Sequence, residues 1–348
     1  MRTAISIGSA YYNGEDWDKM VAYTQAADKF GVDQAWSAEA WGMDAIVPLA
    51  YLAAKTERIK LGTGIMQISA RVPSMIAMTA QSLDTVSNGR FILGLGVSGP
   101  QVVEGLHGAA FAKPLSRMRE CVEILRLGLS GQKLAYEGEH YQLPRKGGEG
   151  KAIRLSQPPR PDLPIYLATL GPKSLQMTGE MADGWLGTCF LPEHNHVFFG
   201  DLQAGADKAG RSLKDIDIQA GGYFEVGENV EELIAARKPG MAFTLGAMGS
   251  PKTNFYNDAY CRAGFEDTAK EVQSLWVDGK RDEAIRRVPD DLVLMANLVG
   301  TEDMVAARLK AFADAGVNTL RLATGGETWE ERTAALDAAM DLIKRTGA

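Results

Sequence analysis

The chain has 348 residues, 45% of them hydrophobic, which is enough apolar material to build a large folded core. Lys and Arg number 37 against 44 Asp and Glu, so the net charge is −7 and general binding to the phosphates of a nucleic acid is disfavoured.

The cysteines also restrict the class of protein. Cys121, Cys189 and Cys261 are an odd number at wide spacing without a CxxC pair, which argues against a disulfide framework or a zinc cluster. The sequence shows neither a secretory signal pattern nor a long uncharged apolar run. We therefore expect reduced thiols in a cytoplasmic protein that does not span a membrane.

Strand-like and helix-like patterns alternate along the chain. We expect strands at 4–8, 32–37, 59–66, 91–96, 165–169, 184–189, 216–226 and 319–323. The helical patterns between and after them cover about 16–31, 46–53, 75–86, 116–129, 172–182, 197–209, 302–315 and 328–345.

Two segments interrupt this alternation. Residues of about 133–156 have short polar alternations typical of a β-hairpin insertion, and about 240–291 contain a second, helical insertion. About eight strands followed by helices predict a (β/α)8 TIM barrel, formed by 1–348 as a single domain. The doubly wound alternative requires a G-x-G-x-x-G fingerprint in the first turn, and GSAYYNGED lacks it.

In a parallel barrel, the loops that follow the strands form the active face. Glu39 follows the second expected strand in the string WSAEAWGMDA, between Ala38 and Ala40. Its carboxylate either caps the strand end or faces a ligand, and the pattern leaves both roles open.

Glycines follow the third and fourth expected strands. The string LGTGIMQISARVP contains Gly62 and Gly64, a pattern typical of a bulge, a close backbone approach or tight packing at a barrel corner. The string LGLGVSGPQVVEGLHG matches a nucleotide-binding motif only superficially, because Pro100 follows and no helix begins at once. Its loop still offers Ser98, Gly99 and open amides to a ligand.

The turn in YLATLGPKSLQMTGE is the fourth candidate. A strand ends at Thr169, Gly171 permits a close turn, Pro172 suits the first position of a helix, and Lys173 adds a positive charge. A phosphate group fits this arrangement. The alternative is an ordinary strand-to-helix turn with a solvated lysine.

Several familiar catalytic motifs are missing from the sequence. His107, His140, His194 and His196 form no H-E-x-x-H motif, and we predict no metal site. The string GVSGP has only one of the two glycines of a nucleophile elbow, and no Walker motif occurs.

As a set, the strings resemble the luciferase-like flavin and deazaflavin oxidoreductases, and most closely the branch that uses coenzyme F420. The resemblance implies a TIM barrel with the cofactor ring in its mouth, a small-molecule substrate and a homodimer. Five strings between about 37 and 258 carry it: AEAWGMDA, RIKLGTGIMQISARVPSMIAMTAQSLD, GRFILGLGVSGPQVVEGLHG, GPKSLQMTGEMADGWL and MGSPKTNFYND.

The resemblance also implies where the cofactor binds. Gly64 and Ile65 match a bulge in the third strand that holds a non-prolyl cis peptide and supports the back of the ring. Gly171, Pro172 and Lys173 match the family's phosphate site, in agreement with the helix start deduced from the residues themselves. The remaining expected cofactor contacts are Glu39, Ser98, Gly99 and Thr169.

One position departs from the family's pattern. Several F420 enzymes have an acid followed by His after the second strand, whereas Ala40 follows Glu39 here. Glu39 is therefore the first candidate for the catalytic acid or base, and His107 is a weaker one.

The sequence thus predicts an F420-dependent oxidoreductase that transfers a hydride between the deazaflavin C5 and a small organic substrate. The alternatives are an FMN-dependent luciferase-like monooxygenase and a non-catalytic protein that binds the deazaflavin.

Overall fold

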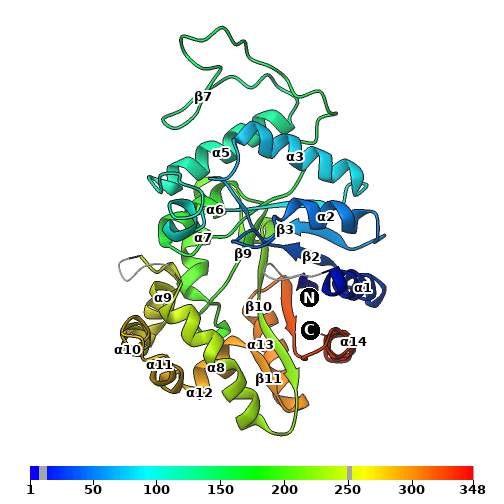
Figure 1. The fold of residues 1–348 in the computed structure, drawn as a ribbon, viewed down its shortest axis with the longest axis vertical. Coiled ribbons are helices and arrows are strands. Elements are labelled where there is room, and N and C mark those ends of the chain that lie inside the picture. The colour runs from blue at the N-terminus through cyan, green and yellow to red at the C-terminus, as the bar shows by residue number, and fades with distance from the viewer. Residues whose placement is uncertain (8–13, 249–252, 348) are drawn as a thin grey trace.

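The computed structural model describes residues 1–7, 14–248 and 253–347. Within this part of the chain, 8 parallel strands form a closed barrel (Figure 1). The barrel strands are β1 (Arg2–Ser6), β2 (Gln34–Ser37), β3 (Lys60–Thr63), β5 (Phe91–Gly96), β8 (Ile165–Leu167), β9 (Gly184–Leu186), β10 (Asp217–Val226) and β12 (Thr319–Thr324).

The order of the strands around the barrel follows the chain. β1 pairs with β2, and the ladder continues through β3, β5, β8, β9 and β10 to β12, which pairs with β1 again. Each of these pairs is parallel. The predicted (β/α)8 barrel is therefore confirmed. Two short strands lie outside the ring: β4 (Met66–Gln67) pairs with β5, and β11 (Leu298–Gly300) pairs with β10.

Helices cover the outside of the barrel (Figure 1). Those that follow the strands are α1 (Gly14–Phe30), α2 (Ile46–Ala53), α3 (Pro73–Val86), α4 (Pro100–Val103), α5 (Pro114–Leu129), α6 (Pro172–Met181), α7 (His196–Lys208), α13 (Glu302–Asp314) and α14 (Trp329–Thr346). The chain itself starts several of them, because Pro stands in the first turn of α3, α5 and α6, and Thr328 forms a capping box with Glu331 at α14.

Side chains fill the inside of the barrel. A hydrophobic cluster separate from the main core draws one residue from each of five barrel strands, so it lies within the ring. Its members are Ala4, Trp36, Ile92, Tyr166 and Leu186. All 6 residues of β5 are buried, because one face meets this cluster and the other meets the helices.

A polar network closes the amino end of the barrel. Asp217 accepts hydrogen bonds from the Tyr166 hydroxyl at 2.7 Å, from the Thr319 hydroxyl at 2.8 Å and from Arg2 at 2.8 Å. These residues come from four strands, and a buried carboxylate needs such partners. The other end, at the carboxyl ends of the strands, is where (β/α)8 barrels bind their ligands.

Both insertions are present. The hairpin predicted in 133–156 is confirmed by the antiparallel pair β6 (Tyr136–Glu137) and β7 (Gln142–Leu143), and this segment projects beyond α5 in Figure 1. The second insertion is wider than the predicted 240–291, because its helices extend from Val230 to Ala296. They are α8 (Val230–Gly246), α9 (Phe255–Tyr260), α10 (Glu266–Val277), α11 (Arg281–Arg287) and α12 (Asp290–Ala296), with a π-turn at Cys261–Phe265. The single-domain assignment stays a prediction.

The prediction of one continuous strand at 59–66 is wrong. This segment is divided into β3 and β4, because the pairing with β5 stops at Gly62 and resumes only at Met66, with Gly64 and Ile65 bulging between them.

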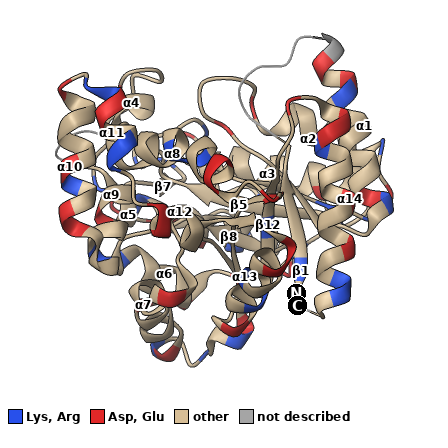
Figure 2. Cartoon of the chain, turned by 90° about the horizontal axis from the view of Figure 1, so that it is seen from below, with Lys and Arg blue, Asp and Glu red and all other residues tan. Residues whose placement is uncertain are grey.

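Charged side chains of both signs are mixed along the outer helices, as Figure 2 shows for α10 and α14. On α14, Arg345 pairs with Asp341 at 2.8 Å and with Glu302 of α13 at 2.8 Å. In the described residues, no helix is long and apolar enough to cross a membrane. The same residues contain no group of three or more His, Cys, Asp or Glu arranged to hold a metal ion.

Candidate active site

A backbone bulge marks the carboxyl end of β3. The Gly64–Ile65 peptide bond is cis, which confirms the prediction from the sequence. The bulge is bonded to the end of β2, because the Gly64 N–H donates to the Ser37 carbonyl at 2.6 Å and the Glu39 N–H donates to the Ile65 carbonyl at 3.1 Å. β3 and β2 thus hold a ridge of backbone at the mouth of the barrel.

The glycines of β5 accommodate this ridge. A Cβ added at Gly96 would lie 2.7 Å from the Ile65 side chain, and one added at Gly94 would lie 1.9 Å from the Thr63 carbonyl oxygen. Only glycine leaves room for so close an approach. Gly94 and Gly96, within β5, therefore have a packing role beneath the bulge and not that of a nucleotide-binding motif.

Glu39 follows β2 and is paired with a cation. Its carboxylate accepts hydrogen bonds from Arg71 Nη1 at 2.8 Å and from the Gln67 N–H at 3.1 Å, with the Ala45 N–H at 3.4 Å. The Glu39 side chain is only 7% exposed. Both oxygens are engaged by the segment just after the bulge, and these contacts favour an orienting role. The predicted catalytic role of Glu39 stays a prediction.

Arg71 is a residue that sequence reasoning missed. It stands in the quoted string RIKLGTGIMQISARVP, seven residues after Gly64, and a cation so near the candidate acid was the available signal. Its guanidinium also lines a cavity of about 300 Å³ together with Val97, Phe111 and Arg117. The ion pair therefore connects the bulge to a space that opens beside it.

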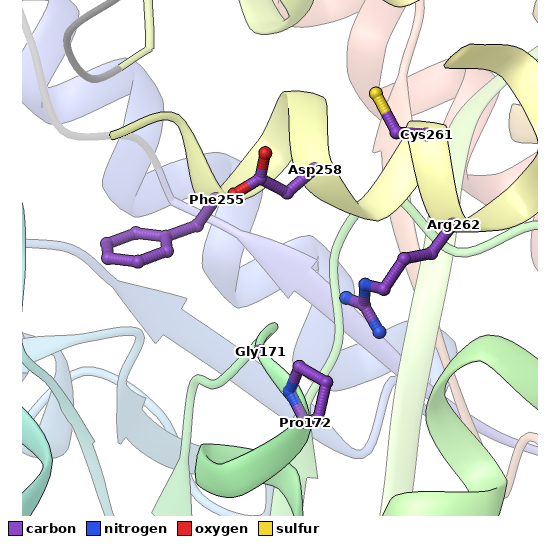
Figure 3. A pocket seen from close by; sticks show the side chains of 6 residues that line it. All are labelled: Gly171, Pro172, Phe255, Asp258, Cys261 and Arg262. Atoms are coloured by element: carbon purple, nitrogen blue, oxygen red, sulfur yellow. The ribbon is translucent and has the colours of Figure 1, made fainter. Parts of the chain in front are cut away.

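The predicted phosphate turn lies at the start of α6. Gly171 and Pro172 line a cavity of about 340 Å³ (Figure 3). Among the described residues no side chain caps α6, so the first N–H groups of the helix remain available to an anion. The Lys173 side chain is exposed beside them. The geometry fits a phosphate group, and direct contact with one stays a prediction.

Thr169 supports this turn from below. Its hydroxyl shares a hydrogen bond of 2.8 Å with the Thr178 hydroxyl, and its carbonyl accepts a bond from the Trp185 indole N–H at 2.9 Å. Thr169 is buried and does not line the cavity. Its expected contact with the cofactor is untested.

Arg262 completes the cavity from the second insertion. Figure 3 shows its guanidinium pointing toward Gly171 and Pro172. The group is held by the Val197 carbonyl at 3.0 Å and the Leu170 carbonyl at 2.5 Å. Burial lowers the pKa of Arg262, yet guanidinium remains charged in proteins. Arg262 could not be predicted, because a single arginine in a helical insertion has no characteristic sequence pattern.

The cavity at α6 is not purely basic. Asp258 of α9 also lines it, next to Phe255 and Cys261. The string MGSPKTNFYND, which begins at Met248, lies partly outside the described residues, and its described end supplies Phe255 and Asp258 to this cavity.

Ser98 and Gly99 follow β5 at the same end of the barrel. Ser98 has a φ of 58°, in the left-handed region that is uncommon for a serine. The Gly99 carbonyl accepts bonds from the N–H groups of Val102 and Val103 at 3.1 and 2.9 Å, which starts α4. Both residues are partly exposed, and their contact with a ligand is untested.

The histidines contribute little to this end of the barrel. His107 is exposed in the turn after α4. His140 is buried in the hairpin segment, where its Nε2 lies 2.6 Å from the Ser116 hydroxyl. His107 therefore stays a weak candidate for proton transfer.

The bulge after β3 and the helix start after β8 lie at the same end of one closed barrel, because all barrel strands are parallel. Both features lie at the mouth, the end at which (β/α)8 barrels bind their ligands. A family model described as luciferase-like monooxygenase matches residues 2–319. The chain belongs to the luciferase-like monooxygenase family.

Two relatives extend this finding. A Mycobacterium tuberculosis protein named as a coenzyme F420-dependent oxidoreductase is 38% identical over 340 residues, which are 95% of this chain and 97% of the relative. The 5,10-methylenetetrahydromethanopterin reductase of Methanolobus tindarius is 30% identical over 305 residues, 87% and 89% of the two chains.

The fold is similar to solved structures as well. The coenzyme F420 dependent tetrahydromethanopterin reductase from Methanopyrus kandleri aligns with a TM-score of 0.79 and 24% identity, over 99% of this chain and 97% of the other. This likeness supports the shared barrel.

Proposed function

We propose that the protein is a coenzyme F420-dependent oxidoreductase that transfers a hydride between the cofactor and a small organic substrate. The observation that carries the proposal is that the bulge between β3 and β4 and the uncapped start of α6 lie at the same mouth of the barrel. The 38% identity to a protein named for coenzyme F420, over 95% of this chain, supports this cofactor over FMN.

The residues present fit such a cofactor. The ridge at Gly64 and Ile65 offers a flat support for a tricyclic ring, and the first N–H groups of α6 with Lys173 and Arg262 offer donors to its phosphate. When bound, coenzyme F420 supplies C5 as the carbon that accepts or gives the hydride. This chain's part is to hold the ring against the ridge and to exclude water from its open face.

Glu39 has two possible tasks in this scheme. It can move a proton for the substrate, or it can fix the segment after the bulge through Arg71 and Gln67. The hydrogen bonds support the second task, since Oε2 already accepts bonds from Arg71 and Gln67, and Oε1 lies 2.7 Å from Arg71 Nη1.

We also propose a homodimer. The helices α2 and α3 are neighbours on the barrel surface. Both carry large apolar side chains that are exposed and that a partner subunit would bury. They are Val47, Tyr51, Met75, Met78 and Val86. Met78→Asp should raise the monomer fraction in size-exclusion chromatography with light scattering, whereas Ile153→Asp, on an exposed residue elsewhere, should not.

A cytoplasmic location is part of the same proposal. Cys121, Cys189 and Cys261 are all free thiols, and burial raises the pKa of Cys121 to about 12. Unpaired cysteines are typical of a reducing compartment.

The experiment that tests the phosphate site uses Lys173→Ala and Arg262→Met. Each variant should weaken the binding of coenzyme F420 by about 1.5 to 3 kcal/mol, the scale of a hydrogen bond to a charged group. Binding is measured by quenching of the deazaflavin fluorescence. Lys60→Ala is the matched control, because Lys60 is exposed at the amino end of β3, the opposite end of the barrel. If both variants bound coenzyme F420 as tightly as the wild type, the proposal that its phosphate lies in this cavity would be wrong.

A further inference from the structure

Arg321 points into the barrel from β12. Thr319, two residues earlier, bonds to Asp217 inside the barrel, and residues two apart on a strand share a face. The Arg321 guanidinium donates through Nη2 to the Gly187 carbonyl at 2.9 Å, just beyond the end of β9. The side chain therefore lies on the inner face, nearer the mouth than the network at Asp217.

The mouth is open just above Arg321. Ala323 is the next residue on the same face of β12, and it is exposed. Arg321 itself is partly exposed although protein surrounds it closely, and burial lowers the pKa of its guanidinium. The partner of Arg321 in the strand register is Gly221, which has no side chain to meet it.

Arg321 lacks a counter-charge among the described residues. Its titratable neighbours are Cys189 and Tyr256, and burial raises the pKa of the first to about 12 and the pKa of the second above its usual range. Both groups are neutral at physiological pH. A partly buried guanidinium with no anion beside it is unfavourable unless something else supplies the charge.

Its hydrogen bonds are also incomplete. A guanidinium has five N–H donors, and Arg321 has a single hydrogen bond, to Gly187, within the described part of the chain. Arg90 shows how a purely structural arginine differs. It makes five hydrogen bonds, to the carbonyls of Ala53, Thr56, Ile59 and Ser87 and to the Thr56 hydroxyl. Arg321 therefore has N–H donors for which the described part of the chain supplies no acceptor, on the inner face of the barrel near the mouth.

The site is separate from the cavity at α6. Phe255, Asp258 and Arg262 line that cavity, whereas Tyr256 and Tyr260 of the same helical segment lie beside Cys189 and Arg321. Arg321 does not line the cavity at α6. A phosphate held at α6 would thus leave Arg321 for another anion.

We propose that Arg321 binds an anionic group of the substrate, a carboxylate in the first instance, through the free side of its guanidinium. The inference rests on the proposed function in taking the barrel mouth as the substrate site. A planar carboxylate matches the two parallel N–H donors of an arginine, and the pairing supplies the missing charge. The substrate class is then a small organic acid, held by its carboxylate while its reacting carbon faces the cofactor.

The test compares anionic and neutral probes of equal shape. The full chain without cofactor is titrated by calorimetry with benzoate and benzamide, and with acetate and acetamide. We expect each acid to bind at least about tenfold more tightly than its amide, the effect of one charge-assisted pair. Arg321→Met should abolish this preference, and Arg321→Lys, which keeps the charge without the fork, should reduce it. Arg345→Met, on the exposed surface of α14, is the control.

The outcomes are distinct. An equal affinity of the wild type for acid and amide, or a preference that survives in Arg321→Met, would overturn the proposal. A loss of affinity for coenzyme F420 in Arg321→Met would overturn it too, because the residue would then belong to the cofactor. If the wild type binds benzoate through Arg321 but does not bind coenzyme F420, the anion site stands and the proposed cofactor fails. If the Met variant does not fold, the Lys variant carries the same comparison.

Discussion

Replacing Glu39 by Gln tests what holds the bulge in place. The carboxylate accepts bonds from Arg71 and from the Gln67 N–H, and its side chain is 7% exposed. The Gln side chain has an NH₂ group where Glu39 has its second carboxylate oxygen, so a donor would face the N–H donors that now bond to that carboxylate. Gln is also neutral, so Arg71 would lose its counter-charge. Breaking a buried ion pair on one side costs about 3 to 5 kcal/mol. Because Arg71 is 20% exposed, we expect about 2 to 3 kcal/mol here.

The assay is urea unfolding of Glu39→Gln, Arg71→Met and the double variant. If the two side chains act as a pair, the double variant should lose little more stability than either single one, with a coupling energy of about 1 to 3 kcal/mol. Glu302→Gln is the control, since Glu302 forms an exposed pair with Arg345 and its loss should change stability little. If the losses of unfolding free energy in the two single variants added up in the double variant, Glu39 and Arg71 would not act as a pair.

Kinetics of the same variants separate the two roles of Glu39. An orienting role predicts weaker binding of coenzyme F420 in both Glu39→Gln and Arg71→Met, with most of the maximal rate retained at saturation. A proton-transfer role predicts a rate lower by about 10²- to 10⁴-fold in Glu39→Gln alone, at nearly constant affinity. A Gln variant that keeps both rate and affinity would leave Glu39 as a strand-end cap.

Two further predictions concern packing and pH. Gly94→Ala should destabilise the protein by at least about 1 to 3 kcal/mol in urea unfolding, because its Cβ would lie 1.9 Å from the Thr63 carbonyl; a stable variant would contradict the close packing of β5 on β3. The hydrogen bonds from Arg119 lower the pKa of Glu180 from 4.5 to about 2, so this pair should stabilise the fold above pH 4.5 and lose its effect as the pH falls toward 2. Glu180→Gln should therefore lower the melting temperature at pH 7, and the difference from the wild type should shrink on acidification; a constant difference across this range would contradict it.

The barrel and its bulge could be predicted because their causes are local. Apolar residues at the periods of strands and helices indicate the alternation, and glycines mark the places where backbones approach closely. Gly64 and Gly96 are examples, since one forms the bulge and the other leaves room for Ile65. Such signals depend on only a few consecutive residues, so they can be recognised without knowledge of the fold.

The cations of the mouth could not be predicted in the same way. Arg262 reaches the turn at Gly171 from an insertion far along the chain, and Arg321 reaches the mouth from β12. Their roles depend on which loops meet at one end of the barrel, and on whether a carboxylate lies near. Neither condition leaves a pattern in the neighbouring sequence, so these residues emerge only when the strands are closed into a ring.

A parallel titration with two cofactors decides whether the barrel mouth binds a deazaflavin or a flavin. The purified protein is titrated with coenzyme F420 and, in parallel, with FMN, with binding followed by the fluorescence of each ring. We expect saturable binding of coenzyme F420 that is much tighter than that of FMN, and that weakens in Lys173→Ala and Arg262→Met. Tight binding of FMN, with none of coenzyme F420, would contradict this expectation.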